Sequence, residues 1–198
     1  NVAFSNGSLP AGFLARIQKG QALSAPLDVK RYFVSPEESG QICMLACMLG
    51  NNREIFFPRL EEEQMMTFDQ IAIKLLRKYG YEALQCESDE AAIDISTRLE
   101  KGSKKYPVHF SNSDTSGEKS YEEFYTSAEK VDLGRFQSLG VIIEKVIPEK
   151  KKIDLLFMKL DQIFAKEETR KEDVVCVLRE YLPNFEHIET GKSLDSKM

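Results

Sequence analysis

The sequence lacks the pairs of cysteine and histidine from which metal sites are commonly built. Its 198 residues include two histidines and four cysteines, and Cys43, Cys47, Cys86 and Cys176 show no paired C-x-x-C spacing. Zinc sites need closely spaced Cys and His ligands, so we predict no metal site. The cysteines are expected to be buried free thiols rather than metal ligands or disulfide partners, as in a reducing cytoplasm.

The chain also lacks an excess of basic residues and a long apolar run. Lys and Arg total 27 against 32 Asp and Glu, for a net charge of -5. Nucleic-acid binding is therefore disfavoured, and any anion site must be local. The apolar run 42–49 is much too short to span a bilayer, and no signal peptide opens the chain. We expect a cytoplasmic protein without a membrane span. The first residue, Asn1, is not Met, which suggests that the sequence begins inside a longer protein.

The overall composition is typical of a globular domain, and the sequence shows no recognisable catalytic centre. Hydrophobic residues make up 42% of the chain and charged residues 30%, and a chain of this length can bury a sizeable core. The sequence contains no G-x-S-x-G, no P-loop and no G-x-G-x-x-G motif. We therefore predict no catalytic residue in this chain.

Residues 30–39, KRYFVSPEES, predict a short strand that leads directly into a helix. Side chains alternate along a strand, so Arg31 points to one side while Lys30 and Tyr32 point to the other. The following Ser-Pro-Glu-Glu run matches the Ser-x-x-Glu capping box with proline at the first helical position. The start of the helix is therefore well specified.

Arg31 is the basic residue best placed to hold an anion. Its planar guanidinium matches the oxygens of a phosphate or a carboxylate, and a strand rather than a loose loop positions it. A Gly-Ser turn at residues 5–8 opens a helix and presents free backbone N–H groups in the same way. Both features also have ordinary interpretations, because a turn can simply cap its helix and Arg31 can form a surface ion pair with Glu37 or Glu38.

Strands and helices alternate through the first half of the chain, which indicates an α/β or α+β arrangement. Helices are expected over residues 8–20, 36–49, 67–79 and 88–102, and strands over 54–57, 83–86, 106–110 and 140–144. A polar connection is expected at 25–28. The helix 36–49 is apolar almost all round, so we expect it to be deeply packed. Pro107 suggests that the strand 106–110 lies at a sheet edge.

From Pro148 onward, charge and helical periodicity dominate the sequence. Two apolar stripes predict a helical hairpin joined near residues 168–170. We therefore divide the chain into a first part, residues 1–147, and a helical C-terminal extension, residues 148–198.

Five segments, spread along nearly the whole chain, resemble segments of bacterial nucleotide-sugar 4,6-dehydratases and occur in the same order. These segments are NVAFSNGSLPAGFLARIQKG, VKRYFVSPEESGQI, EIFFPRL, SGEKSYEEF and YLPNFEHIETGKSLDSKM. The chain looks like the carboxyl-terminal half of such an enzyme, similar to the UDP-N-acetylglucosamine type of the extended short-chain dehydrogenase/reductase superfamily and to polysaccharide biosynthesis proteins. The resemblance implies an α/β fold in which residues 1–147 form the sugar-nucleotide-binding lobe. The Rossmann half would lie outside this sequence.

The resemblance also implies substrate contacts at Asn1, Ser8, Leu9, Arg31 and Glu118. Asn1 matches the family's Asn-Val, which contacts the diphosphate, and Ser8 and Leu9 fall where a helix start approaches the nucleotide. Arg31 matches the Arg of the Arg-[Phe/Tyr]-[Phe/Trp] strand, which binds phosphate. Glu118 matches the acid of the Arg-Pro-Gly-Glu-Lys segment, implied to bind the ribose hydroxyls.

The chain departs from the family pattern at Thr115, which replaces the phosphate-binding Arg of that last segment. This leaves Arg31 as the main expected phosphate cation in the chain. An acidic helix near residues 88–102 also departs from the simplest family pattern.

The activity that the resemblance implies is that of an NAD(P)-dependent lyase. It would form a 4-keto-6-deoxy sugar nucleotide for surface polysaccharide or nonulosonic acid synthesis. The NAD or NADP would be bound mainly by the missing half, so we expect this chain alone to be inactive, and the whole protein to be a homo-oligomer. Two alternatives stay open: an epimerase or reductase of the same superfamily, and a non-catalytic interaction module that binds through its terminal hairpin.

Overall fold

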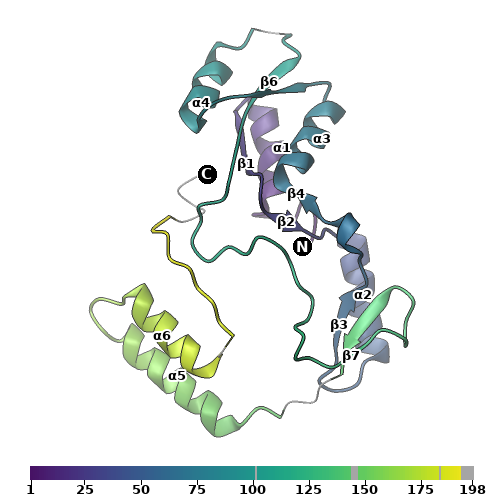
Figure 1. Ribbon diagram of the computed structural model, residues 1–198, viewed down its shortest axis with the longest axis vertical. Coiled ribbons are helices and arrows are strands. Elements are labelled where there is room, and N and C mark those ends of the chain that lie inside the picture. The colour runs from purple at the N-terminus through teal and green to yellow at the C-terminus, as the bar shows by residue number, and fades with distance from the viewer. Residues whose placement is uncertain (101, 144–146, 183, 193–198) are drawn as a thin grey trace. The chain divides into compact units, whose positions relative to one another are not determined.

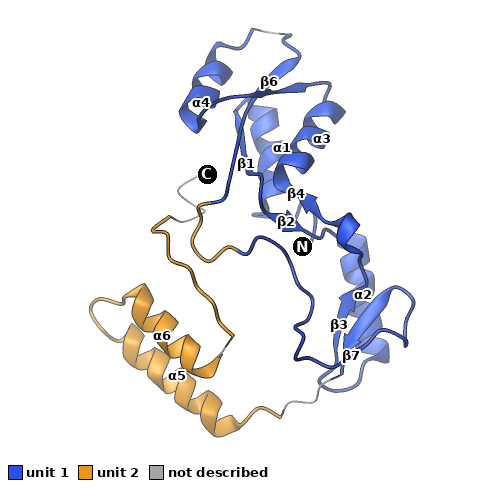
Figure 2. Ribbon diagram, in the orientation of Figure 1, with its two compact units in different colours: residues 1–113, 119–144, 197 blue, residues 114–118, 145–196, 198 orange. Residues whose placement is uncertain are grey.

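The computed structural model describes residues 1–100, 102–143, 147–182 and 184–192 (Figure 1). They form two compact units, drawn in different colours in Figure 2. The first unit comprises residues 1–113 and 119–144, and the second comprises residues 114–118 and 145–196. The short segment 114–118 thus groups with the C-terminal part of the chain. The sequence-based boundary between residues 147 and 148 stays a prediction.

The first unit is a mixture of helices and short strands. Its helices are α1 (Leu9–Lys19), α2 (Pro36–Leu49), α3 (Phe68–Lys78) and α4 (Asp89–Arg98), with a 3-10 turn η1 (Glu62–Gln64). Its strands are β1 (Leu23–Pro26), β2 (Lys30–Arg31), β3 (Ile55–Pro58), β4 (Met66–Thr67), β5 (Glu82–Gln85), β6 (Lys105–Ser111), β7 (Val131–Asp132) and β8 (Leu139–Ile142). The expected α/β fold class is confirmed.

Three small sheets organise these strands. One is parallel with the order β1-β6-β5, one is the antiparallel pair β2-β4, and one is antiparallel with the order β3-β8-β7. Helices α1 and α3 pack beside the parallel sheet. Their apolar stripes join its strands in the main core, formed by Phe13, Ile17, Leu23, Ala25, Ile71, Ala72, Leu75, Leu76, Tyr106 and Val108.

The predicted helix ends are confirmed where a cap is encoded locally. The Ser8 hydroxyl accepts a hydrogen bond from the Ala11 amide at 3.3 Å and starts α1, which ends at Gly20 in the left-handed conformation. In α2 the Ser35 hydroxyl accepts from the Glu38 amide at 3.1 Å, and the Glu38 carboxylate accepts from the Ser35 amide at 2.7 Å. This is the complete capping box that the sequence predicted.

The prediction of an edge position for the strand with Pro107 was wrong, because β6 is the central strand of the parallel sheet. The Val108 carbonyl accepts from the Cys86 amide on the β5 side, so the neighbouring Pro107 turns its backbone toward β1. There β1 begins at Leu23, which lies opposite Val108. Pro107 therefore stands just beyond the end of the β1 ladder, where its missing N–H breaks no pairing.

The expected polar connection at 25–28 was also only partly correct. Leu23–Pro26 forms strand β1, in which Leu23 and Ala25 alternate into the core. The segment is too short, and too rich in small residues and proline, for its period of two to stand out in the sequence. Its pairing with β6 is what makes it a strand.

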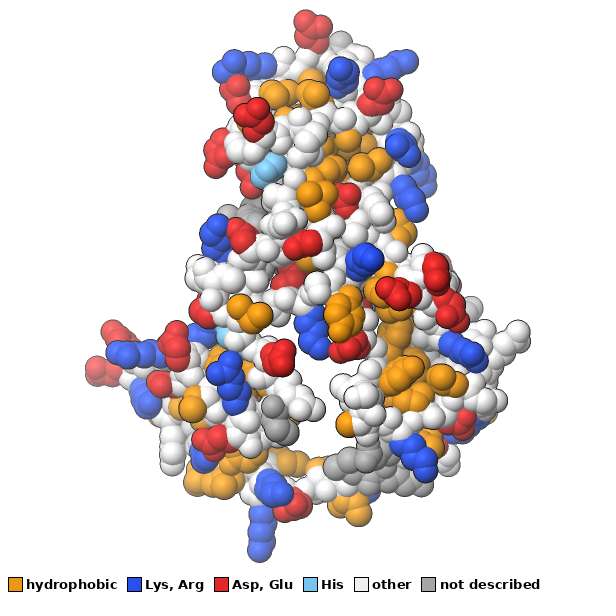
Figure 3. Space-filling view, in the orientation of Figure 1, with side chains coloured by type: hydrophobic (Ala, Val, Ile, Leu, Met, Phe, Trp, Pro, Cys, Tyr) orange, Lys and Arg blue, Asp and Glu red, His pale blue; other side chains and the backbone are white. Residues whose placement is uncertain are grey.

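Deep packing of α2 was predicted and is wrong. None of its residues is buried, and Met44 and Met48 are 68% and 80% exposed. Only a narrow stripe of half-buried residues that includes Ile42 and Ala46 faces the unit. Hydrophobic side chains lie open over α2 in Figure 3. An apolar helix is buried on every side only when elements of the fold surround it, and within the described residues α2 lacks such neighbours.

The second unit contains the predicted helical hairpin. Its helices are α5 (Lys150–Phe164) and α6 (Lys171–Tyr181), joined across residues 165–170. Ile163 and Val177 are their buried contacts, and Lys159 forms an ion pair with Glu180. Residues 144–146 and 193–198, which end the predicted strand 140–144 and the C-terminal extension, lie outside the described residues. In the part of the chain that the structure describes, no helix is both long and apolar enough for a membrane crossing.

The cysteines test the packing of α2 directly. All four are free thiols, but Cys43, Cys47 and Cys176 are exposed and only Cys86 is buried, so the prediction of burial holds for Cys86 alone. We expect three thiols of the native chain to react rapidly with a colorimetric disulfide reagent and the fourth to react only after unfolding. Variants with Cys43→Ser and Cys47→Ser should each lose one rapid equivalent. A native chain with a single rapid thiol would contradict the exposed position of α2.

Candidate functional site

Strand β2 is the element that positions Arg31, and its backbone is held along both edges. On one edge β2 pairs antiparallel with β4, with Arg31 opposite Met66. On the other edge the Lys30 amide donates to the Ser120 carbonyl at 2.8 Å. A strand paired on both sides cannot rotate about its axis, so the direction of each of its side chains is set.

The side chain of Arg31 meets Glu122, which the local sequence did not suggest as its partner. The guanidinium Nε lies 3.2 Å from the Glu122 Oε2, and the Arg31 side chain is only 13% exposed. The Arg31 Nη1 also donates to the Lys30 carbonyl at 2.8 Å. Arg31 is thus a half-buried cation beside the Glu122 carboxylate.

Asn1 reaches the same carboxylate as Arg31. The Asn1 Nδ2 donates to the Glu122 Oε2 at 3.1 Å. Backbone pairing brings the two segments together, because Val2 and Val34 form a parallel bridge and the Val34 amide donates to the Asn1 carbonyl at 2.9 Å. The structure therefore brings together two of the residues that the resemblance implied, Asn1 and Arg31, through a carboxylate that sequence reasoning missed.

This group, Asn1, Arg31 and Glu122, combines an amide donor, a cation and an anion. Arg31 is neutralised by Glu122, whose side chain is 38% exposed. An incoming phosphate would compete with this carboxylate for the guanidinium, which offers five N–H donors in a fixed fork. The arrangement suits reversible binding of an anion.

Ser8 and Leu9, for which the resemblance implies substrate contacts, both have structural roles in the first unit. The Ser8 hydroxyl is engaged in capping α1, and Leu9 is half-buried against the main core. Glu118 belongs to the segment 114–118 of the second unit. The substrate contacts implied for Ser8, Leu9 and Glu118 stay predictions.

A cavity of about 480 Å³ lies on the side of β2 that Lys30 and Tyr32 face. Its walls come from β2, the 3-10 turn η1 and the segment that follows residue 119. The lining residues are Asp28, Lys30, Tyr32, Glu62, Met65, Ser120 and Tyr121. Lys30 and Tyr32 share this wall, as the predicted alternation along the strand requires.

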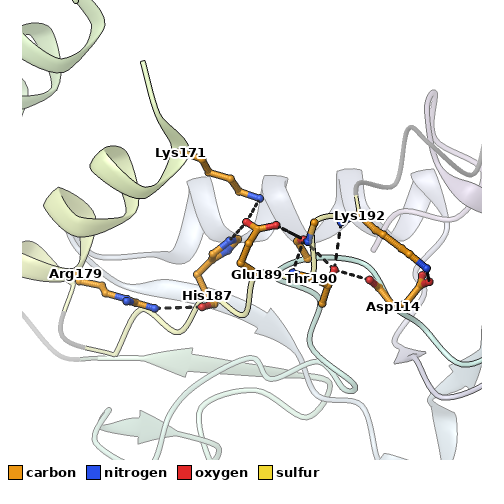
Figure 4. A network of polar contacts seen from close by, with 9 residues as sticks. Asp114, Lys171, Arg179, His187, Glu189, Thr190 and Lys192 are labelled. Carbon is orange, nitrogen blue, oxygen red and sulfur yellow. Dashed lines mark hydrogen bonds and ion pairs between the residues drawn. The ribbon is translucent and has the colours of Figure 1, made fainter. Parts of the chain in front are cut away.

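The second unit contains a polar network that joins the segment 114–118 to the C-terminal segment (Figure 4). The Glu189 carboxylate lies 2.6 Å from Lys171 Nζ and 3.0 Å from His187 Nε2, and accepts from the Ser116 hydroxyl at 2.7 Å. Lys192 Nζ lies 2.5 Å from Asp114 Oδ2 at the other end of the network.

Glu189 is the centre of this network. The pKa of its carboxyl is held well below its ordinary value by Lys171 first, then by His187, Ser116 and the Gly191 amide. A lowered carboxyl pKa contributes to stability above the ordinary value of 4.5, and this contribution is lost as the pH falls below it. The network therefore ties the two segments together near neutral pH.

We expect Glu189→Gln to loosen the contact between these segments at neutral pH. The readout is the hydrogen-exchange protection of the Gly117 amide, which donates to the Ile188 carbonyl at 2.9 Å. Protection should fall in the variant at pH 7, and wild type and variant should converge as the acid is titrated below about pH 4.5. Glu186→Gln, which removes an exposed carboxylate nearby, is the control. A constant difference at every pH would rule out the carboxylate as the cause.

One family model and one solved structure each match most of the chain. A family model described as "Polysaccharide biosynthesis protein" matches residues 1–139. No curated protein matches the sequence. Among solved structures, Pen from Bacillus thuringiensis is similar with a TM-score of 0.51 and 16% identity, over 80% of this chain and 47% of that chain. At this identity the similarity shows the fold alone, and the chain spans about half the length of that protein.

Proposed function

We propose, since the chain belongs to the polysaccharide biosynthesis protein family, that it is the sugar-nucleotide-binding part of a nucleotide-sugar 4,6-dehydratase. The parent protein would act on UDP-N-acetylglucosamine or a similar nucleotide sugar. This chain would bind and position the substrate while the reacting groups come from elsewhere in the parent.

The observation that carries the proposal is the meeting of Asn1 and Arg31 at Glu122. The family resemblance implies that both residues contact the diphosphate, and they lie far apart in the sequence. Their convergence supplies a donor and a cation within reach of one anionic group. Charge-assisted hydrogen bonds of this kind contribute about 1.5–3 kcal/mol each.

Glu122 adds a physical reason for specificity toward a doubly charged group. Binding an anion at Arg31 requires displacement of the Glu122 carboxylate or sharing of the guanidinium with it. The negative charge of Glu122 opposes any anion that leaves it in place, but a diphosphate carries more charge and more acceptor oxygens than a carboxylate and so competes better for the guanidinium than a monovalent anion does.

Binding of NAD or NADP by this chain is not supported by its residues. Dinucleotide sites use a G-x-G-x-x-G turn between a strand and a helix, where backbone N–H groups approach the pyrophosphate. The sequence has no such spacing, and the connections that precede α1 and α3 carry caps instead. In the proposed parent, the cofactor is bound mainly by residues outside this sequence, and this chain acts through substrate positioning.

Arg31→Ala tests the binding role. We expect titration calorimetry of the chain with UDP-N-acetylglucosamine to show a loss of affinity of about 10- to 100-fold, which corresponds to one charge-assisted hydrogen bond. Arg98→Ala is the matched control, because it removes one positive charge from a side chain that is 76% exposed and paired with Asp94. Glu122→Gln should bind at least as tightly as wild type. Equal affinities for wild type and Arg31→Ala would refute the assignment.

The reaction is tested separately in the longer protein that we propose contains this chain. With NAD or NADP and UDP-N-acetylglucosamine, we expect the product to be a 4-keto-6-deoxy sugar nucleotide, identified by mass spectrometry and NMR. A product that differs from the substrate only in configuration would instead identify an epimerase. The separate chain should show no turnover in the same assay.

A further inference from the structure

Helix α5 of the second unit carries an apolar stripe that its partner helix α6 leaves open. Ile153, Phe157, Leu160 and Phe164 follow one another at spacings of four, three and four residues, which is the heptad pattern of a coiled-coil seam. Leu160 is half-buried, but Ile153 is exposed, and Phe157 and Phe164 are each 60% exposed. Figure 3 shows hydrophobic side chains open at the surface of the hairpin. The hairpin therefore leaves most of this seam uncovered.

The position of α6 explains why the stripe is open. Lys159 forms an ion pair with Glu180, and its Nζ lies 5.5 Å from the ring centroid of Tyr181. Tyr181 is the last residue of α6, so α6 ends beside the middle of α5 and does not extend along its first turns. The contacts with α6 also lie on another side of α5. At 3.6 residues per turn, Phe157 points about a third of a turn away from Lys159 and the buried Ile163.

The charges of α5 are the reverse of those that its own dipole favours. Its first turn carries Lys150, Lys151 and Lys152 and no acidic residue, and Glu167 and Glu168 follow its end. A helix dipole is stabilised by anions near the N-terminus and by cations near the C-terminus. Helices α3, α4 and α6 each follow this rule, with acidic residues in the first turn and basic residues in the last. The charges of α5 therefore need a partner outside the helix.

A second copy of α5 supplies the missing charges. Lys151, Glu167 and Glu168 form no ion pair with another described residue, so their charges are available to a partner. An antiparallel copy brings the lysines at the start of each helix beside the acidic residues that follow the end of the other. A parallel copy would instead set the lysines of the two chains against each other, and like charges repel.

We propose that the apolar stripe of α5 is the contact surface of a symmetric homodimer, in which two copies of the helix pack antiparallel about a two-fold axis. Ile153 of each copy then opposes Phe164 of the other. Phe157 opposes Leu160 in the centre of the seam, so each exposed aromatic side chain packs on an aliphatic one.

This inference is independent of the proposed function. The family model ends at residue 139, so α5 lies outside the matched part of the chain. Neither Asn1 nor Arg31 belongs to the second unit. The inference names the surface that would form the homo-oligomer expected from the resemblance.

Sedimentation velocity of the full chain from about 1 μM to about 1 mM tests the interface. We expect a reversible shift from the 22.6 kDa monomer to a species of twice this mass. Phe157→Glu places a charge in the centre of the seam and should raise the dissociation constant at least about tenfold. Leu155→Glu makes a matched change at a leucine that is 43% exposed on the opposite side of α5, and should leave it unchanged. Circular dichroism checks that both variants keep their helices.

Charge reversal tests the antiparallel direction. Lys151→Glu and Glu167→Lys should each weaken the dimer by about two- to fivefold, because each sets like charges across the interface, and the double variant should recover wild-type affinity. The inference is overturned if the chain stays monomeric throughout the concentration range, or if Leu155→Glu weakens the dimer as much as Phe157→Glu does. It is also overturned if the double variant shows no recovery. Loss of the dimer in Met48→Glu, with Phe157→Glu unaffected, would assign the interface to α2 instead.

Discussion

The backbone pairing of β2 on both of its edges is the constraint on which the candidate site depends. β4 holds one edge and the Ser120 carbonyl holds the other. Because the strand cannot turn, Arg31 is directed to Glu122 and Asn1, while Lys30 and Tyr32 are directed to the cavity. Two chemically different surfaces, one that carries the Arg31 guanidinium with its Glu122 partner and one that is a cavity with Lys30 and Tyr32 in its wall, thus arise from three consecutive residues.

The surrounding fold provides a rigid support for this strand. Helices α1 and α3 pack with the parallel sheet into the main core, and Phe33, which follows β2 closely, packs on that core edge-to-face with Phe68 of α3. On the cavity side, Tyr32 stacks on Phe124, which also stacks on Phe57 of β3. The residues that directly follow β2 are therefore joined through aromatic contacts to the main core and to β3. Closely packed aromatic neighbours restrict the motion of the segment that carries the candidate site, which favours a pre-organised site.

Some features of the fold and the site were predictable because they depend on neighbours in the sequence. Ser8 and Gly20 delimit α1, and Ser35 with Glu38 starts α2, since each cap bonds to an amide within three or four residues. The alternation that separates Arg31 from Tyr32 is equally local. The partners of these side chains were not predictable. Nothing in the spacing of the segment around Glu122 relates it to Arg31 or Asn1, and the exposed α2 shows that an apolar composition does not reveal what a helix packs against.

The sequence by itself determined where the capped helices α1 and α2 begin and the two-sided character of the segment 30–34. It also carried the resemblance that implies contacts at Asn1, Ser8, Leu9, Arg31 and Glu118. These properties follow from interactions within a few residues, which any fold must satisfy. Only the tertiary structure decided that Pro107 lies in a central strand, that Glu122 joins Asn1 to Arg31, and that Tyr32 lies in the wall of a cavity. Those outcomes depend on pairings between segments far apart in the chain, and such pairings have no local period or cap to reveal them.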